Sequence, residues 1–237
     1  MRASTSAHIV VLQLDPEAPP GLLGSHLAAL GGEVTVTESR PDATLPEISQ
    51  TCAGLVVLGG TASAVDASGA PAFPALVDQL RARHAMHRPS LGLGLGAQLL
   101  AQALGGGVRA AGAPEFGYVD LVPTKLASSD PVLSGIGAGL PLMLWHDDAI
   151  DLPTAEPLAH CHRGRVLAFR SGRWAHGLQF HPGATIDIVR RWAALRGQER
   201  NNPAVPVRIS AEIVRHQERA ERFGRSVVEG WFRLISG

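Results

Sequence analysis

The clearest pattern in the chain is an alternation of short apolar runs with segments of helical spacing. Residues 9–14 and 55–58 are rich in Val, Ile and Leu and end in Asp-Pro and Gly-Gly. Strands that are covered on both faces of a parallel sheet have this composition. A third apolar run, residues 90–93, turns into a helical pattern within two residues. The chain is therefore predicted to begin in the order β, α, β, β, α and to continue with a third central strand and a helix.

Helices are predicted where apolar residues recur on one face between Gly or Pro boundaries. One helix covers residues 22–30 and ends at Gly31-Gly32, a second follows Pro71, and a third runs to the glycines at 105–107. Thr185 to Arg196 has the same spacing. These helices and the apolar runs together predict an α/β protein with a mostly parallel central sheet.

The second half of the chain has a different pattern, with short alternating segments separated by Gly, Pro and Asp. The segments at 116–122, 140–144, 157–161, 166–170 and 175–180 predict an antiparallel or mixed extension of the sheet, whereas 105–114 is turn-rich and predicts no strand. Residues 198–206 are predicted to be a linker, and 209–235 an amphipathic helix. We expect one domain over 1–197, with 198–237 packed on it. A partner or dimer interface is the alternative for that helix.

Composition and charge exclude several classes of protein. The 237 residues are 45% hydrophobic and 18% charged, with a formal net charge of +0, so there is no basic field to hold nucleic acid or a membrane surface. The two cysteines, Cys52 and Cys161, give no disulfide framework, and no apolar run approaches the ~20 residues of a spanning helix. We expect a protein of the reducing cytoplasm, without nucleic acid or membrane as partner.

Candidate chemistry follows four predicted strands at their carboxyl ends, where open α/β sheets bind ligands. The segments are GGT at 59–61, GLGAQ at 94–98, WHDD at 145–148 and HPG at 181–183. Residues 92–97 also satisfy the glycine fingerprint of dinucleotide sites, but Glu115 does not end a following parallel strand, so we expect no such cofactor. His160 and His162 share a strand face with no further ligand in view, so we expect no metal.

In chain order, these segments resemble the class I glutamine amidotransferase family from about residue 9 to residue 193. The segment PSLGLGLGAQLLA at 89–101 is similar to the family's nucleophile segment, and QFHPG at 179–183 is similar to its Gln-Phe-His-Pro-Glu. LVVLGG at 55–60, EFGY at 115–118 and WHDD at 145–148 add to the likeness. The resemblance implies a flavodoxin-like, three-layer open sheet.

The same resemblance places Gly94 where the family has its catalytic cysteine and Gly183 where it has the glutamate of the triad. A glycine has no atom that can attack an amide, and His181 without its carboxylate loses the group that would orient it. The family's oxyanion hole uses main-chain N–H groups at positions that correspond to Gly60 and Leu95, so it does not depend on side chains. Gln98, Tyr118 and His146 stand at or near family positions that line the glutamine pocket.

Two functions follow as alternatives. The first is a protein that does not hydrolyse glutamine and binds an amino-acid-like or carboxylate ligand, or a partner protein, in the old pocket. The second is an enzyme of altered chemistry, in which His181, His146 or Asp148 acts as acid or base on a carbonyl held by the Gly60 and Leu95 donors. Neither function calls for a cofactor. A synthase partner or a homodimer is compatible with both.

Overall fold

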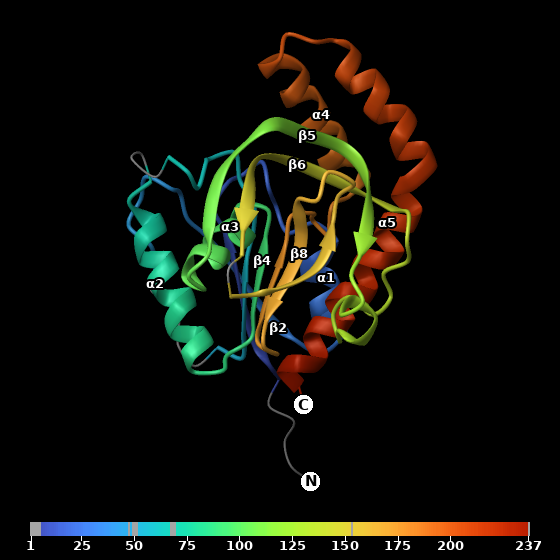
Figure 1. Ribbon diagram of the computed structural model, residues 1–237. Coiled ribbons are helices and arrows are strands. Elements are labelled where there is room, and N and C mark those ends of the chain that lie inside the picture. Colours follow the sequence, from blue (N-terminus) through green and yellow to red (C-terminus); the bar gives the residue numbers. More distant parts are fainter. Residues whose placement is uncertain (1–5, 47, 49–51, 67–69, 153, 237) are drawn as a thin grey trace.

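The computed structural model describes residues 6–46, 48, 52–66, 70–152 and 154–236. In this part of the chain nine strands form one sheet in the order β2-β1-β3-β4-β9-β8-β7-β5-β6 (Figure 1). The strands are β1 (His8–Gln13), β2 (Glu33–Glu38), β3 (Gly54–Val57), β4 (Ser90–Leu93), β5 (Gly107–Pro123), β6 (Leu140–Asp151), β7 (Glu156–His160), β8 (Val166–Ser171) and β9 (Ala175–Leu178). The helices are α1 (Leu22–Ala29), α2 (Ala72–Ala85), α3 (Leu95–Ala103), α4 (Ile186–Glu199) and α5 (Ala204–Ser236).

The central sheet is parallel where the apolar runs predicted it. β1 pairs in parallel with β2 and β3, β3 with β4, and β4 with β9. Beyond β9 the pairing becomes antiparallel, through β8 and β7 to β5 and β6. The predicted flavodoxin-like architecture with a mixed extension is thereby confirmed.

Two helical layers cover the central strands, because alternate residues of each strand point to opposite faces. Val11 and Val56 pack in one core cluster with residues of α1 and α5. Val10 and Val57 pack in a second cluster with residues of α2 and α3. Figure 1 shows α2 and α3 on one side of the sheet and α1 and α5 on the other. The apolar runs of the central strands are thus covered on both faces, as their composition predicted.

The extension differs from the prediction in two places. β5 begins at Gly107, inside the segment that was expected to be turn-rich, and pairs with β6 through a register shift between Ala110 and Glu115. β6 runs on to Asp151, so residues 145–148 lie inside a strand and not beyond its end. In Figure 1 both strands arch over one end of the sheet. The prediction was wrong because small residues interrupt the alternation in β5 and because polar residues follow Trp145 in β6.

The predicted linker is also shorter than expected. α4 ends at Glu199 and α5 begins at Ala204, so only residues 200–203 connect them. Pro206 stands in the first turn of α5, where a helix has no use for the N–H group that proline lacks. The Asn202 side chain accepts a hydrogen bond from the Ala204 N–H group at 3.0 Å and caps this turn. The Asn and Pro residues that predicted a linker therefore mark a tight helix start.

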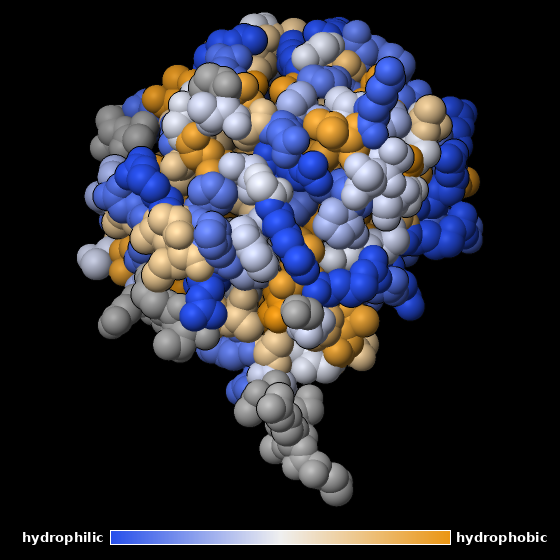
Figure 2. All heavy atoms as spheres, turned by 60° about the horizontal axis from the view of Figure 1, so that its bottom comes forward, coloured by the Kyte–Doolittle hydropathy of each residue, from blue (hydrophilic) through white to orange (hydrophobic). Residues whose placement is uncertain are grey.

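The C-terminal helix packs against its own chain over much of its length. Its buried residues include Ile213, Val227 and Trp231, and Trp231 belongs to the same core cluster as α1 residues Leu23 and Leu27. On the face shown in Figure 2, apolar residues occur in small groups among hydrophilic ones. Among the described residues, no helix has both the length and the apolar character that crossing a membrane requires.

Replacing Trp231, which is fully buried, tests the packing of α5. We expect Trp231→Ala to lower the free energy of unfolding by about 3–5 kcal/mol, because it removes a large core side chain. Val214→Ala on the same helix, where the side chain is 87% exposed, should change it by less than about 0.5 kcal/mol. Urea titrations followed by circular dichroism measure both values. Similar, small effects of both substitutions would show that α5 does not pack on the sheet in solution.

Candidate functional site

The turn between β4 and α3 has the geometry of a strand-to-helix elbow. Gly94 has φ +53° and ψ −115°, a conformation that side-chain-bearing residues rarely adopt. Its N–H group donates to the Leu178 carbonyl at 2.8 Å, which ties the elbow to β9. A Cβ atom placed on Gly94 would meet the Gly59 Cα atom at 3.5 Å, an ordinary contact distance. The elbow therefore has room for a side chain but imposes backbone strain on one.

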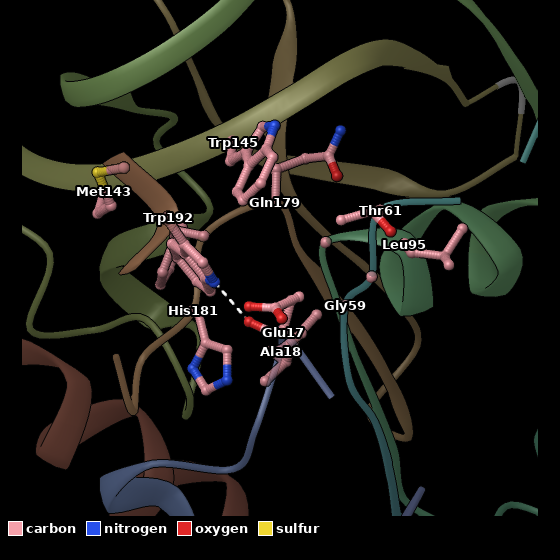
Figure 3. Close-up of a pocket in the computed structure, with 14 residues that line it drawn as sticks. Glu17, Ala18, Gly59, Thr61, Leu95, Met143, Trp145, Gln179, His181 and Trp192 are labelled. Atoms are coloured by element: carbon pink, nitrogen blue, oxygen red, sulfur yellow. Dashed lines mark hydrogen bonds between the residues drawn. The ribbon is translucent and has the colours of Figure 1, made fainter. Parts of the chain in front are cut away.

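A cavity opens beside this turn, and we call it the elbow cavity (Figure 3). The Leu95 N–H group begins α3 and lies at the positive end of the helix, whereas the Ala97 and Gln98 N–H groups donate to the Gly94 carbonyl at 3.0 and 3.1 Å. Aromatic and sulfur-containing side chains form the opposite walls. The lining residues are Glu17, Ala18, Gly59, Gly60, Thr61, Leu93, Gly94, Leu95, Met143, Trp145, Gln179, Phe180, His181 and Trp192.

Segments from both halves of the chain close the elbow cavity. The Trp192 indole N–H donates to the Glu17 carbonyl at 2.6 Å (Figure 3). Arg191 Nη2 lies 2.6 Å from Glu17 Oε1. On the other side, the Asp15 carboxylate accepts hydrogen bonds from the Thr61 N–H group at 2.8 Å and its hydroxyl at 2.6 Å. The loops after β1 and β3 and the helix α4 are thereby fixed around one space.

His181 lies in the elbow cavity, but both of its ring nitrogens are engaged. The Gly183 N–H group donates to Nδ1 at 3.0 Å, so Nδ1 carries the lone pair. The other nitrogen, Nε2, then carries the proton and donates to the Pro19 carbonyl at 2.9 Å. Burial lowers the pKa of His181 to about 4. The ring is a neutral group with no nitrogen directed at the elbow for proton transfer.

Residue 183 has no space for a side chain. A Cβ atom there would lie 2.6 Å from both the Leu23 nitrogen and the Pro20 oxygen. The Leu22 N–H group donates to the Gly183 carbonyl at 2.9 Å. Gly21 has φ +56°, and a Cβ atom added to it would lie 2.0 Å from the same carbonyl oxygen. The start of α1 therefore occupies the volume into which a carboxylate at this position would extend.

A second space, the side cavity, holds most of the other residues singled out by the sequence. Gln98, His146 and Asp148 line it, whereas His181 does not. It shares Gly60, Thr61, Leu95 and Trp145 with the elbow cavity. Asp148 Oδ2 accepts from the Ser63 hydroxyl at 2.8 Å, so this carboxylate is already paired. The structure brings Gly60 and Leu95 together between the two cavities and separates His181 from His146 and Asp148.

His146 is buried and held by its cross-strand neighbour. Its Nδ1 contacts the Asp148 carbonyl at 2.9 Å. Its Nε2 lies 3.0 Å from Glu115 Oε2, without the alignment of a hydrogen bond. The imidazole, more than any other group, holds the pKa of Glu115 below its usual range, against the opposing effect of burial. Because both nitrogens face oxygen atoms, His146 stabilises the β5–β6 pair and offers no free nitrogen to a ligand.

Tyr118 and the two cysteines lie outside both cavities. Tyr118 donates from its hydroxyl to Gln217 of α5, and burial with the nearby Glu212 and Glu221 raises its pKa. Cys161 is buried, and its thiol contributes to lowering the pKa of Glu115. Cys52 is buried where Arg83 Nη1 contacts its sulfur at 3.2 Å. The expectation that Tyr118 lines the ligand pocket is therefore not met by its position.

Sequence reasoning missed several residues that shape the site. Glu17 follows the carboxyl end of β1, which is the position that the rule for open sheets would have pointed to. Trp192 and Arg196 face the site from α4, and a helix of amphipathic pattern carries no signal for such a role. Arg196 is buried beside Asp147, with Glu199 at 3.0 Å, and its guanidinium lies 5.9 Å from the Trp145 ring centroid.

Comparison with known sequences supports the family that the sequence motifs resemble. The family Glutamine amidotransferase class-I matches residues 22–187, more than half of the chain. GMP synthase [glutamine-hydrolyzing] of Thermus thermophilus is 32% identical over 149 residues, which cover 59% of this chain and 28% of that protein. A GMP synthase subunit from Sulfolobus acidocaldarius is 34% identical over 97 residues, covering 40% of this chain and 50% of the relative. The chain thus spans half or less of the length of these curated relatives.

Solved structures extend the likeness over nearly the whole chain. A glutamine amido transferase from Methylobacillus flagellatus superimposes with a TM-score of 0.82 at 25% identity, covering 97% of this chain and 96% of the other. A glutamine amidotransferase from Thermotoga maritima has a TM-score of 0.83 at 19% identity, which shows the fold. The elbow, the sheet order and the matched sequence define a glutamine amidotransferase domain. This chain belongs to the class I glutamine amidotransferase family.

The pH dependence of stability tests the neutral state of His181. Its pKa of about 4 in the folded protein is below the ~6.5 of an unfolded histidine, so the unfolded state binds more protons between these values. The stabilisation is complete above about pH 6.5 and is lost as the pH falls toward 4. We expect the free energy of unfolding to fall more steeply over this window in the native sequence than in His181→Ala. Substituting exposed His162 is the control, and equal slopes in all three proteins would contradict the assignment.

The crowding around residue 183 predicts that alanine at this position destabilises the protein more than alanine at Gly137. Gly183→Ala should lower the free energy of unfolding by about 1–3 kcal/mol, because its Cβ atom meets backbone atoms that have no free space to move into. Gly137→Ala, where a Cβ atom would meet nothing within 4 Å, should change it by less than about 0.5 kcal/mol. Chemical denaturation measures both. A neutral Gly183→Ala would mean that the start of α1 lies further from residue 183 than in this structure.

Proposed function

We propose that this protein is a glutamine amidotransferase-like protein that does not hydrolyse glutamine and that binds a ligand with a carbonyl or carboxylate group in the elbow cavity. The observation that carries the proposal is Gly94 at the elbow, together with an engaged His181 and a residue 183 that has no room for a carboxylate. A thioester mechanism needs a thiolate at the elbow and a base with a free nitrogen. The described residues supply neither.

The binding half of the proposal rests on the groups that remain. The first turn of α3 presents main-chain N–H groups at the positive end of a helix, and such an end favours a negatively charged or carbonyl oxygen. Gly60 stands beside Leu95 where both cavities meet. Apolar walls with a few polar groups are typical of small-molecule sites. The Sulfolobus relative is named as one subunit of a synthase, and association with a synthase is compatible with this role.

An enzyme of altered chemistry is the weaker candidate. It would need His181, His146 or Asp148 to move a proton at a bound carbonyl. Each of these groups already contacts a partner within the protein. His146 and Asp148 line the side cavity, whereas His181 does not. The binding function therefore accounts for more of the geometry.

An ammonia-release assay with glutamine tests the catalytic half of the proposal. We expect no release from the native sequence, and none from Gly94→Cys, because His181 has no free nitrogen to activate the new thiol. The Gly94→Cys thiol should nevertheless react rapidly with iodoacetamide, since the helix terminus stabilises its thiolate, whereas Cys52 and Cys161 are buried and should stay unlabelled.

Glutamate and ammonia produced by the native sequence, and abolished by His181→Ala, would disprove this half. For the binding half, thermal-shift and calorimetric titrations with amino acids, their amides and small carboxylates provide the test. If none of these compounds stabilises the protein, the elbow cavity is vestigial and the binding half of the proposal is wrong.

A further inference from the structure

One polar side chain of the elbow cavity, that of Gln179, has no partner among the described residues. Gln179 follows β9, whose pairing with β4 aligns Leu178 with Leu93. The next residues along the two strands are Gln179 and Gly94, so Gln179 lies beside the elbow, and it lines the elbow cavity. Figure 3 shows its amide extending toward the side of the cavity where Thr61 and Leu95 lie.

The Gln179 amide is buried without any hydrogen bond. The residue is 3% exposed, and neither Nε2 nor Oε1 has a partner in the part of the chain that the structure describes. The other polar side chains around this cavity are satisfied: Thr61 by Asp15, Glu17 by Arg191, and His181 by Pro19 and Gly183. Burying an unpaired amide is costly, and native proteins rarely leave such a group without a partner. The arrangement favours a bound state in which the Gln179 amide gains a hydrogen-bond partner.

The chemistry of the amide specifies that partner. Its N–H₂ group donates and its carbonyl accepts, side by side in one plane. A second amide edge, as in a primary carboxamide or a cyclic amide, satisfies both at once. A carboxylate accepts from the N–H₂ group but leaves the Gln179 carbonyl unpaired. The Trp145 and Trp192 side chains on the cavity wall suit a flat ring next to that edge.

We propose that the elbow cavity binds an uncharged, planar molecule with an amide edge, and that Gln179 selects it through a paired donor and acceptor. The space beside Gly94, where a Cβ atom would meet only Gly59 within 4 Å, accommodates that edge. This inference rests on the proposed binding function and narrows its ligand from carbonyl compounds in general to amides.

Three compounds that share a benzoyl group test the selection. Benzamide carries a donor and an acceptor, benzoate carries acceptors alone, and N,N-dimethylbenzamide has no donor. We expect benzamide to bind at least tenfold more tightly than the other two, and the Gln179 side-chain N–H₂ signals to shift on its addition in heteronuclear NMR spectra. Those signals are assigned from their loss in Gln179→Met.

Substitution at position 179 separates recognition from folding. Gln179→Met keeps the length of the side chain and removes both polar atoms, so we expect benzamide affinity to fall at least tenfold while the melting temperature rises. Gln102→Met is the control, because Gln102 donates to the Ala64 carbonyl at 3.1 Å and lines neither cavity; its benzamide affinity should be unchanged.

Three outcomes would overturn the inference. Equal affinities for the three compounds, unaffected by Gln179→Met, would leave the cavity as a binding site but remove Gln179 as its selector. Preference for benzoate would identify an anion site, so the proposed binding function would stand without this narrowing. Failure of all three compounds to bind would exclude planar amides, and the broader ligand panel would then decide separately whether the cavity binds anything.

Discussion

The parallel pairing of β4 with β9 is the interaction on which the site depends. It joins residues 90–93 to residues 175–178, two segments far apart in the chain, in one register. The Gly94 N–H group extends this pairing by one further hydrogen bond to Leu178. A shift of one residue would turn every β9 side chain to the opposite face. Gly94, Gln179 and His181 share a cavity because this register holds.

The segments that follow β4 and β9 differ in what they contribute to the site. The elbow at Gly94 keeps a conformation that glycine adopts at no steric cost, although the site has space for a larger residue. The segment after β9 instead packs against the start of α1, through Gly183 and His181. One half of the site thus has the geometry of an elbow, while the other half forms part of the packing between a loop and a helix.

Much of the fold could be predicted from the sequence, because buried parallel strands such as residues 55–58 have continuous apolar runs. Segments of β5 and β6 were predicted, but the start of β5 was not, since Gly112 and Pro114 interrupt the alternation and the pairing with β6 accommodates this with a register shift. Gly60 and Leu95 line both cavities, because they follow strand ends, which fix backbone positions. The position of Tyr118 depended on α5, which the sequence does not orient. Nothing in the motif QFHPG shows that the histidine is engaged on both nitrogens.

The contact between Gly183 and the start of α1 also limits the side chains that position 183 can accept. Two loops meet there with no side-chain volume between them, and Gly21 fits only as a glycine. A substitution that placed an acidic residue at position 183 would have to displace the start of α1. Any variant with a carboxylate at this position therefore first loses stability, so the packing of one loop against one helix restricts which side chains the site can acquire.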